Sequence, residues 1–253
     1  YIPDSNNKYI QGDNMRVTIC KNYDEVSKKA SEMVAAKMIL KPHCVLGLAT
    51  GSTPVGMYKK LVEMNKNGEI DFSSVKTINL DEYYPMQPDN EQSYRYFMNS
   101  NLFDHINIDK KNTFVPNGTA KDIEKECAEY DARIDEYGID IQILGIGQNG
   151  HIGFNEPDSA LCAATHITGL TENTIEANSR FFDSADEVPK KAITMGMASI
   201  LKAKTIVLLA SGKAKHDAVK SLLDDKITTD VPATLLKVHS DVVLICDEDA
   251  YNG

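Results

Sequence analysis

Asp81 is the side chain of this sequence that is best placed for proton chemistry. It follows the apolar stretch Val75–Leu80, which predicts a buried strand with the acid at its carboxyl end. In open α/β sheets, ligands bind at the edge formed by the carboxyl ends of the strands. A carboxylate held there can act as a base on a carbon acid. Taken alone, however, an acid at a strand end more often caps the following loop.

A second group of reactive side chains lies about 70 residues further along the chain. The loop Gly150–Pro157 holds His151 and Glu156, and Asn149 directly precedes it. The spacing of His151 and Glu156 differs from the i, i+4 pair that binds a metal on a helix, and no third ligand is evident, so we expect no metal. A loop histidine beside a carboxylate and an amide suits proton transfer near neutral pH. Taken alone, a hydrogen-bonded structural histidine would explain this loop better.

Thr50, Gly51, Ser52 and Thr53 form a short polar loop between a predicted strand and a predicted helix. Gly51 permits a tight turn, and Pro54 stands in the first turn of the helix, where its missing N–H does no harm. A helix N-terminus favours a bound anion by roughly 0.3–2 kcal/mol. The sequence lacks the P-loop pattern of nucleotide-binding proteins. The loop therefore suits a small phosphate ligand, with simple helix capping as an equal alternative.

Two cations could contact the same phosphate. Lys213 follows Ser211 and Gly212, again between a predicted strand and a predicted helix. Arg180 lies beside two aromatic residues within the segment 161–187, which is less periodic and could be a lid over the site. An arginine can form a bidentate phosphate contact as such a lid closes. Each cation alone is more often an ordinary surface side chain.

The run Gly145–Gly150 matches the G-x-G-x-x-G pattern of dinucleotide-binding proteins. That pattern must open a helix, whose N-terminus then holds the pyrophosphate. Here Gly153 and Pro157 follow closely, and both oppose a helix. We therefore expect no dinucleotide cofactor.

The composition indicates a globular protein with a small-molecule partner. The chain has 253 residues, of which 42% are hydrophobic and 25% charged. A net charge of −10 argues against nucleic acid and anionic membranes as partners. The five cysteines are scattered without a C-x-x-C pair, which is typical of buried thiols in a reducing cytoplasm. No apolar run reaches 20 residues, and no signal-peptide pattern is present.

Strands and helices alternate along the chain from Met15, whereas residues 1–14 are polar and are expected to be a leader or a disordered tail. The predicted strands are Val45–Ala49, Val75–Leu80, Asp140–Gly145, Thr205–Ala210 and Val242–Cys246. The predicted helices start at Asn22, which with Glu25 resembles a capping box, and then cover Pro54–Asn65, Glu91–His105, Ile123–Gly138 and Lys213–Leu223. Apolar strands separated by helices predict an α/β, doubly wound, mostly parallel sheet with helices on both faces, Rossmann-like, in a single domain over residues 15–253.

Taken together, these segments resemble the glucosamine-6-phosphate deaminase (isomerising) family. The resemblance covers almost the whole chain from Met15 to Asp249 and is carried by six ordered blocks. The blocks are LGLATGSTP at Leu46–Pro54, NLDEY at Asn79–Tyr83, LGIGQNGHIGFNEP at Leu144–Pro157, NSRFF at Asn178–Phe182, SGK at Ser211–Lys213 and PATLLKVH at Pro232–His239. The related 6-phosphogluconolactonases share the fold, but NLDEY and GHIGFNEP are closer to the deaminases.

The resemblance implies a reaction without metal or organic cofactor. His151, oriented by Asn149 and Glu156, would move the proton that opens the pyranose ring of glucosamine 6-phosphate. Asp81 would then take the C2 proton, form an enolamine and return a proton to C1. Loss of ammonia and hydration would give fructose 6-phosphate. These roles need two separate proton-transfer groups, which the sequence offers.

The resemblance also assigns the phosphate. It would bind among Thr50, Gly51, Ser52, Thr53, Arg180 and Lys213. Tyr94, in another matched stretch, would shape the pocket. The implied setting is the cytoplasmic catabolism of amino sugars, including N-acetylglucosamine.

Two departures from the family pattern carry expectations of their own. Many members have Asp where this chain has Asn149, which stabilises an imidazolium less and would change the pH optimum. Allosteric hexameric members carry basic residues that bind N-acetylglucosamine 6-phosphate where this chain has Thr165, His166 and Thr168. The chain also ends soon after Asp249. We expect no activation by that sugar and a monomer or low-order homo-oligomer.

Three other functions remain open from the sequence. A galactosamine-6-phosphate deaminase would share Asp81 and His151 and differ in contacts to O4. A 6-phosphogluconolactonase would hydrolyse its substrate without releasing ammonia. A non-catalytic sugar-phosphate sensor would bind without turnover, although it would have little need of Asp81, His151 and Glu156 together.

Overall fold

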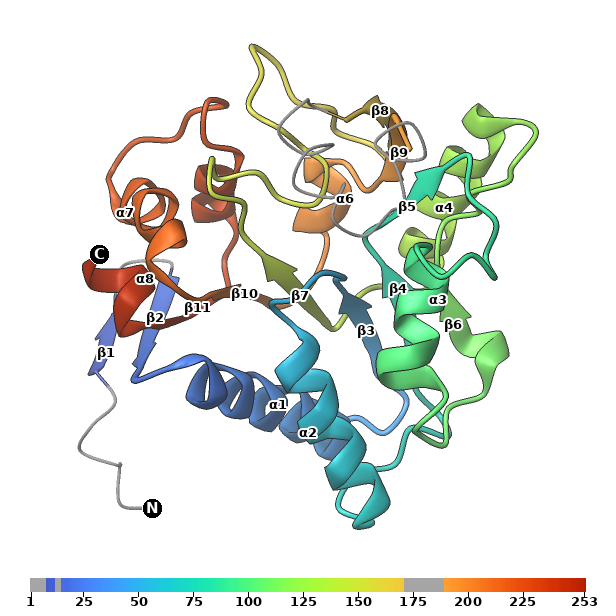
Figure 1. The fold of residues 1–253 in the computed structure, drawn as a ribbon, viewed down its shortest axis with the longest axis horizontal. Helices are drawn as coiled ribbons and strands as arrows, with labels where there is room; N and C mark the ends of the chain where they lie inside the picture. Colours follow the sequence, from blue (N-terminus) through green and yellow to red (C-terminus); the bar gives the residue numbers. More distant parts are fainter. Residues whose placement is uncertain (1–7, 12–14, 171–188) are drawn as a thin grey trace.

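The computed structural model describes residues 8–11, 15–170 and 189–253 (Figure 1). Its central sheet has eight strands, and only β1 runs antiparallel to its neighbour. In spatial order the strands are β1 (Lys8–Gln11), β2 (Met15–Cys20), β11 (Val242–Asp247), β10 (Ile206–Ala210), β7 (Ile141–Gly145), β3 (Val45–Leu48), β4 (Lys76–Asn79) and β6 (Thr113–Phe114). The predicted doubly wound, mostly parallel fold is confirmed.

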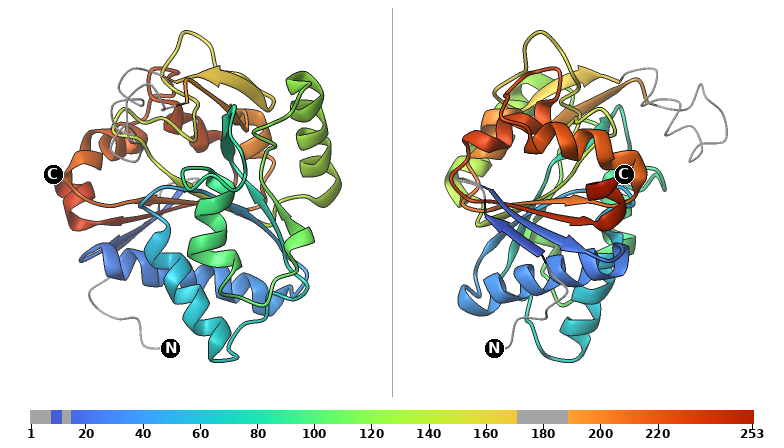
Figure 2. Two further views of the ribbon diagram at one scale, coloured as in Figure 1. Left: turned by 45° about the vertical axis from the view of Figure 1, so that its right-hand side comes forward. Right: turned by 90° about the vertical axis from the view of Figure 1, so that its left-hand side faces the viewer.

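Helices cover both faces of this sheet (Figures 1 and 2). One face packs on α1 (Tyr23–Leu40), α2 (Val55–Lys66) and α3 (Tyr94–Met98), which continues as the π-helical turn η1 (Asn99–Phe103). The other face packs on α4 (Ile123–Tyr137), α6 (Met197–Leu201), α7 (His216–Leu223), η5 (Pro232–Val238) and α8 (Glu248–Asn252). Two short turns, η2 (Lys110–Asn112) and η4 (Lys213–Lys215), complete the set of described helices.

The sequence signals for helix starts correspond to real caps. The Asn22 side chain accepts the N–H of Glu25, as the capping box predicts. The helix predicted from Glu91 begins only at Tyr94, because Ser93 is the cap and accepts the N–H of Tyr96. The helix predicted from Lys213 starts as the turn η4 and becomes α-helical only at α7.

A second, three-stranded antiparallel sheet lies over the α4 and α6 side of the central sheet (Figure 1). It contains β5 (Asp81–Tyr84), β9 (Lys191–Thr194) and β8 (His166–Gly169). The chain changes sheets at Leu80, whose N–H bonds Leu48 and whose carbonyl bonds Met195. Asp81 therefore lies just past the carboxyl end of β4, as predicted, and it also begins a strand of the second sheet, which the sequence did not predict.

The order of the central strands places the candidate site. From β3 the chain moves outward to β4 and β6, and from β7 it moves the other way to β10 and β11. The sheet therefore has its switch point between β3 and β7, where open α/β sheets bind ligands at the carboxyl edge. Asp81 follows β4, and the loops after β3, β7 and β10 contain residues Thr50–Thr53, His151 and Lys213. Four neighbouring strands thus deliver the predicted residues to one edge.

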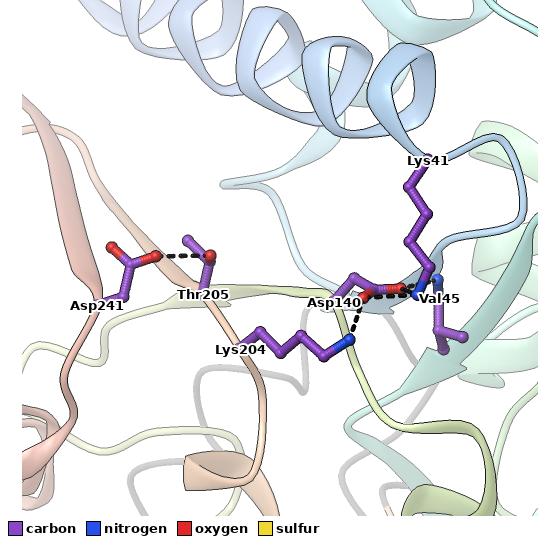
Figure 3. A network of polar contacts seen from close by, with 6 residues as sticks. All are labelled: Lys41, Val45, Asp140, Lys204, Thr205 and Asp241. Carbon is purple, nitrogen blue, oxygen red and sulfur yellow. Dashed lines mark hydrogen bonds and ion pairs between the residues drawn. The ribbon is translucent and has the colours of Figure 1, made fainter.

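The opposite, amino edge is held by an ion cluster around one buried carboxylate (Figure 3). Asp140, 2% exposed, binds Lys41 Nζ at 2.7 Å and Lys204 Nζ at 2.8 Å, and accepts the N–H of Val45 at 2.9 Å. These contacts join the end of α1 to the starts of β3, β7 and β10. Burial by itself raises the pKa of Asp140, but the hydrogen bonds from Lys204, Lys41 and Val45 outweigh it and lower the pKa to about 2.

Part of the segment that was expected to be a leader or a disordered tail forms a strand. Residues 8–11, inside the segment set apart as a leader or tail, form β1 and pair with β2. In the described part of the chain, no helix is long and apolar enough to span a membrane.

The described start of the possible lid is attached to α4. Thr165 donates hydrogen bonds to the Asp131 carboxylate from both its backbone N–H and its hydroxyl.

Candidate active site

Asp81 is buried at the start of β5 and is only 5% exposed. Its carboxylate forms no hydrogen bond or ion pair with any residue that the structure describes. Burial raises the pKa of Asp81 to about 8, and the neighbouring charge of Glu82 adds to the rise. A carboxylate without compensating donors is a strong base once it loses its proton, because its charge is poorly solvated. Asp81 is therefore equipped to accept a proton near neutral pH.

His151, Asn149 and Glu156 meet in the loop after β7. The imidazole Nδ1 of His151 lies 3.2 Å from Glu156 Oε2, which also accepts the Asn149 amide N–H at 2.8 Å. The Asn149 side-chain oxygen accepts the backbone N–H of His151 at 3.2 Å. Since Nδ1 faces the Glu156 carboxylate, Nε2 is the nitrogen left for a ligand. The structure brings these three predicted residues together.

Two glycines let this loop pack tightly around the proton-transfer groups. An added Cβ at Gly147 would lie 2.3 Å from His151 Nδ1, so only glycine leaves room for the ring. Gly153 has φ of +58°, and its Cβ position is 3.3 Å from Asp81 Oδ2. Gly153, two residues after His151, thus brings this loop close to the carboxylate of Asp81, which lies 72 positions earlier in the sequence. This is the contact that makes one site of the two predicted groups.

The same loop is anchored from a distant part of the chain. The carbonyl of Gly150 accepts the N–H of Ala233 at 2.8 Å, at the start of η5. Gly150 has φ of +81°, and an added Cβ would lie 2.4 Å from Val231 Cγ1. The PATLLKVH block therefore anchors the histidine loop, Gly150–Pro157, by a backbone hydrogen bond. No helix follows Gly150 directly, as the sequence predicts for this G-x-G-x-x-G match.

The Thr50–Thr53 loop lies between β3 and α2, as predicted. Gly51 adopts φ of +85° and its Cβ position is open, so the backbone can approach a ligand. The Tyr23 hydroxyl donates to Ser52 O at 3.0 Å and accepts the N–H of Gly56 at 2.8 Å. Among described residues, the N–H groups of Gly51, Ser52 and Thr53 have no acceptor. A preformed set of free donors of this kind suits a phosphate.

Tyr94 connects this loop to Asp81 and to the histidine loop. Its ring lies 4.6 Å from the ring of Tyr83 and is stacked on Phe154 at 6.1 Å. Burial raises the pKa of Tyr94 well above its usual range, and the hydrogen bond to the Thr50 side chain opposes that rise. Tyr94 thus bridges the strand of Asp81, the loop after β7 and the predicted phosphate loop.

The two predicted cations differ in outcome. Lys213 is exposed at the start of η4, after β10, and has no ion pair with another described residue. The loop before it is held by Asp247, which accepts the Ser211 hydroxyl at 2.5 Å and the N–H of Gly212 at 3.0 Å. Arg180 lies outside the described residues, as does most of the possible lid. Its contact with a phosphate stays a prediction.

One residue of the site escaped the sequence reasoning. Glu82, 2% exposed, follows Asp81 on β5, and its carboxylate accepts the N–H groups of Tyr83, Tyr94 and Arg95. The available signal was a second acid directly after Asp81, because a buried carboxylate needs several donors. No group of three or more metal-ligating side chains occurs in the described part of the chain.

A hollow at the amino edge offers no rival site. It is lined by Leu201, Ala203, Lys204, Val238, His239 and Ser240. Both ring nitrogens of His239 are engaged, with Nε2 2.6 Å from Ala203 O and Nδ1 accepting the N–H of Asp241 at 3.1 Å. This histidine holds the backbone and has no free nitrogen for a substrate.

The fold and the site define a parallel α/β protein with groups for proton transfer and anion binding at one sheet edge. The family model of glucosamine-6-phosphate isomerases and 6-phosphogluconolactonases matches residues 21–245. The chain belongs to this family.

Within this family, the chain is more similar to glucosamine-6-phosphate deaminases than to 6-phosphogluconolactonases. The chain is 60% identical over 237 residues to a glucosamine-6-phosphate deaminase of Clostridium perfringens, covering 93% of this chain and 98% of that one. A solved monomeric glucosamine-6-phosphate deaminase superposes with a TM-score of 0.90 at 46% identity, covering 92% of this chain and 98% of that one. A 6-phosphogluconolactonase from Thermotoga maritima reaches a TM-score of 0.71 at 21% identity, covering 93% and 99%. This last likeness shows the shared fold alone.

Proposed function

We propose that this protein is an isomerising deaminase that converts glucosamine 6-phosphate and water to fructose 6-phosphate and ammonia. The observation that carries the proposal is the buried carboxylate of Asp81, which has no partner in the described structure and lies against Gly153 of the histidine loop. High identity to deaminases over 93% of the chain supports the same reaction. The reaction needs no metal and no organic cofactor.

The first step is ring opening, and His151 performs it. Nε2 is the nitrogen that meets the substrate, whereas Nδ1 lies 3.2 Å from Glu156 Oε2. The histidine moves a proton from the anomeric hydroxyl to the ring oxygen, which yields the open-chain aldehyde. Glu156 stabilises the imidazolium during this transfer, and Asn149 holds Glu156 in place.

The second step is proton transfer between carbons, and Asp81 performs it. The carboxylate removes the proton from C2, which becomes acidic once C1 is an aldehyde, and an enolamine results. The same carboxyl group returns the proton to C1 and leaves an imine at C2. Water then adds to the imine and ammonia departs, so the overall reaction consumes one water. Burial of Asp81 keeps bulk solvent away and strengthens the base.

The phosphate anchors the substrate at the other end. The free N–H groups of Gly51, Ser52 and Thr53 and the hydroxyl groups of this loop bind it, together with Lys213 and Arg180. Tyr94 forms part of the wall between the phosphate and the reacting carbons. Binding energy from the phosphate holds C1 and C2 near Asp81, which accelerates the proton transfer.

The proposal also covers the compartment, the metabolic role and the assembly state of the enzyme. We propose that the enzyme acts in the cytoplasm, in the catabolism of amino sugars such as N-acetylglucosamine, and works as a monomer or low-order homo-oligomer. All five cysteines are free thiols, which supports a reducing compartment. The similar solved deaminase is monomeric. Sedimentation at micromolar protein concentration tests the assembly, and cell fractionation tests the compartment.

Three substrates separate this function from its rivals. The purified protein should release ammonia and fructose 6-phosphate in equal amounts from glucosamine 6-phosphate. Release from galactosamine 6-phosphate at a higher kcat/KM would move the enzyme to the other epimer. Hydrolysis of 6-phosphogluconolactone without ammonia release from either hexosamine would make it a lactonase. Tight binding of glucosamine 6-phosphate without any turnover would make it a sensor.

A further inference from the structure

Glu82 is a buried acid whose partners are almost entirely backbone donors. Its Oε1 accepts the N–H of Tyr83 at 2.9 Å and of Tyr94 at 2.8 Å, and its Oε2 accepts the N–H of Arg95 at 2.9 Å. The Arg95 guanidinium is turned away and binds the hydroxyl and carbonyl of Thr113. Glu82 forms no ion pair within the described residues. Glu82 therefore acts as an acceptor for backbone N–H groups and not as a member of a salt bridge.

The three bonds connect the strand of the base to a helix that is far away in the sequence. Tyr94 and Arg95 are the first two residues of α3, and Ser93 caps the next N–H. Glu82 therefore supplies the acceptors that the start of α3 requires. The side chain is also confined from the other side, because an added Cβ at Gly118 would lie 3.2 Å from Glu82 Cγ.

The position of α3 decides where Tyr94 lies. The Tyr94 ring packs against Tyr83 and Phe154, which also contact each other, and a hydrogen bond with the Thr50 side chain lowers the pKa of its hydroxyl. We propose that Glu82 is a positioning residue for the reaction, which docks the start of α3 onto β5 and so holds Tyr94 between Asp81 and the phosphate loop. This inference rests on the proposed function for its kinetic consequence, but its geometric part stands alone.

Glu82 also acts on Asp81 through its charge. The two carboxyl groups are consecutive on β5, and the negative charge of Glu82 contributes to the raised pKa of Asp81. The positive charge of Arg95 acts on Glu82 and lowers its pKa. Burial raises the pKa of Glu82 to about 7, and its backbone hydrogen bonds limit that rise. At a pH above the pKa of Glu82, the Glu82 carboxylate both holds the start of α3 and makes Asp81 a stronger base.

Two variants separate these actions. Glu82→Gln keeps the length and one acceptor oxygen, but it removes the charge and turns an N–H donor toward Arg95. Glu82→Asp keeps the charge and withdraws the acceptors by one methylene. Glu124→Gln changes an exposed acid on α4 and serves as the matched control.

We expect Glu82→Asp to lower kcat/KM for glucosamine 6-phosphate about 10- to 100-fold, because small displacements in a site cost that much. Its acid limb in the pH profile of kcat/KM should stay at the wild-type position. Glu82→Gln should lower kcat/KM as well and shift the acid limb to lower pH, since Asp81 loses its negative neighbour. A residue that only stabilised the fold would lower the urea midpoint without moving either quantity.

Hydrogen exchange of the Tyr94 and Arg95 amides tests the geometric part without any substrate. Both amides should exchange at least ten times faster in Glu82→Asp than in wild type and in Glu124→Gln. If amide protection is unchanged, or if both Glu82 variants match Glu124→Gln in kcat/KM and in the acid limb, the proposal is overturned. If wild type releases no ammonia, the proposed function fails, and the amides alone then decide the role of Glu82. Should Glu82→Gln fail to fold, Glu82→Asp carries the same decision.

Discussion

The two edges of the central sheet each hold a buried aspartate, and the two are opposite in character. Asp140 at the amino edge is 2% exposed and Asp81 at the carboxyl edge is 5% exposed. Asp140 has two lysines and a backbone N–H, and its pKa falls to about 2. Asp81 has none of these, and its pKa rises to about 8. Burial is common to both, so the partners decide whether a carboxylate holds the fold or performs chemistry.

This contrast has a physical rationale. A paired carboxylate stays charged over the working pH range and joins elements permanently. An unpaired one changes its protonation state within that range, as a general base must. The cost is stability, because the folded protein carries a carboxyl group whose ionisation is disfavoured.

The largest effect on stability is expected at the amino edge. Asp140→Asn would leave Lys41 and Lys204 unpaired and should lower the free energy of unfolding by about 2–4 kcal/mol, since the lysines are partly exposed and lose less than fully buried partners. Urea unfolding at pH 7 measures the change, and kcat per folded molecule should stay at the wild-type value. The stabilisation by Asp140 is present above the unfolded pKa near 4 and is lost as the pH falls through about 2. If Asp140→Asn lowered the free energy of unfolding by less than about 0.5 kcal/mol, Asp140 would not hold the fold, and its difference from Asp81 would disappear.

Asp81→Asn should have the opposite effect on stability. The folded pKa of Asp81 is raised to about 8, so its stabilisation is full below the unfolded pKa near 4 and is lost as the pH rises through about 8. The amide does not ionise, and the variant should therefore be more stable than wild type by about 1–3 kcal/mol at pH 8, and by less at pH 5. Urea unfolding at both pH values checks this. A difference that did not grow with pH would contradict the raised pKa.

Asn149→Asp adds a further carboxylate to the active site, beside Glu156. Asn149 donates to Glu156 Oε2 at 2.8 Å, and an aspartate there would place two carboxylates together. The added negative charge favours the imidazolium of His151, so the pKa that governs ring opening should rise. The pH profile of kcat should shift by about one unit or less. An identical profile in the variant would disprove the idea, and Asn149→Ser, which adds no charge, is the control.

The smallest expected effect is that of N-acetylglucosamine 6-phosphate. The described positions where allosteric relatives carry basic residues hold Thr165, His166 and Thr168, and these are engaged locally. Thr165 bonds Asp131, His166 Nδ1 lies 3.0 Å from Ala164 O, and Thr168 bonds Gly169. Rate curves with glucosamine 6-phosphate should therefore be hyperbolic and unchanged by that sugar. Sigmoidal curves that become hyperbolic on its addition would contradict this prediction.

The sequence predicted what depends on local pattern. The cap at Asn22, the polar loop at Gly51 and the buried central strands all follow from neighbouring residue types. The grouping of Asn149, His151 and Glu156 was predicted for the same reason, since these residues share one short loop. Their catalytic and binding roles stay predictions.

Long-range contacts could not be read from such patterns. The chain changes sheets at Leu80 because the Leu80 carbonyl bonds Met195, more than 100 residues away. Glu82 gains its role from the start of α3, and Gly153 gains its role from Asp81. Periodicity describes which face of an element is buried, but not which distant backbone group will meet a given carboxylate.

Turnover by Asp81→Asn at pH 8 tests whether Asp81 is the base that removes the C2 proton. Ammonia release from glucosamine 6-phosphate should fall by about 10²–10⁴-fold relative to wild type, because the base is gone, while substrate affinity changes by less than tenfold. Glu124→Gln should match wild type in both. A variant that keeps ammonia release within tenfold of wild type would show that another group moves the C2 proton.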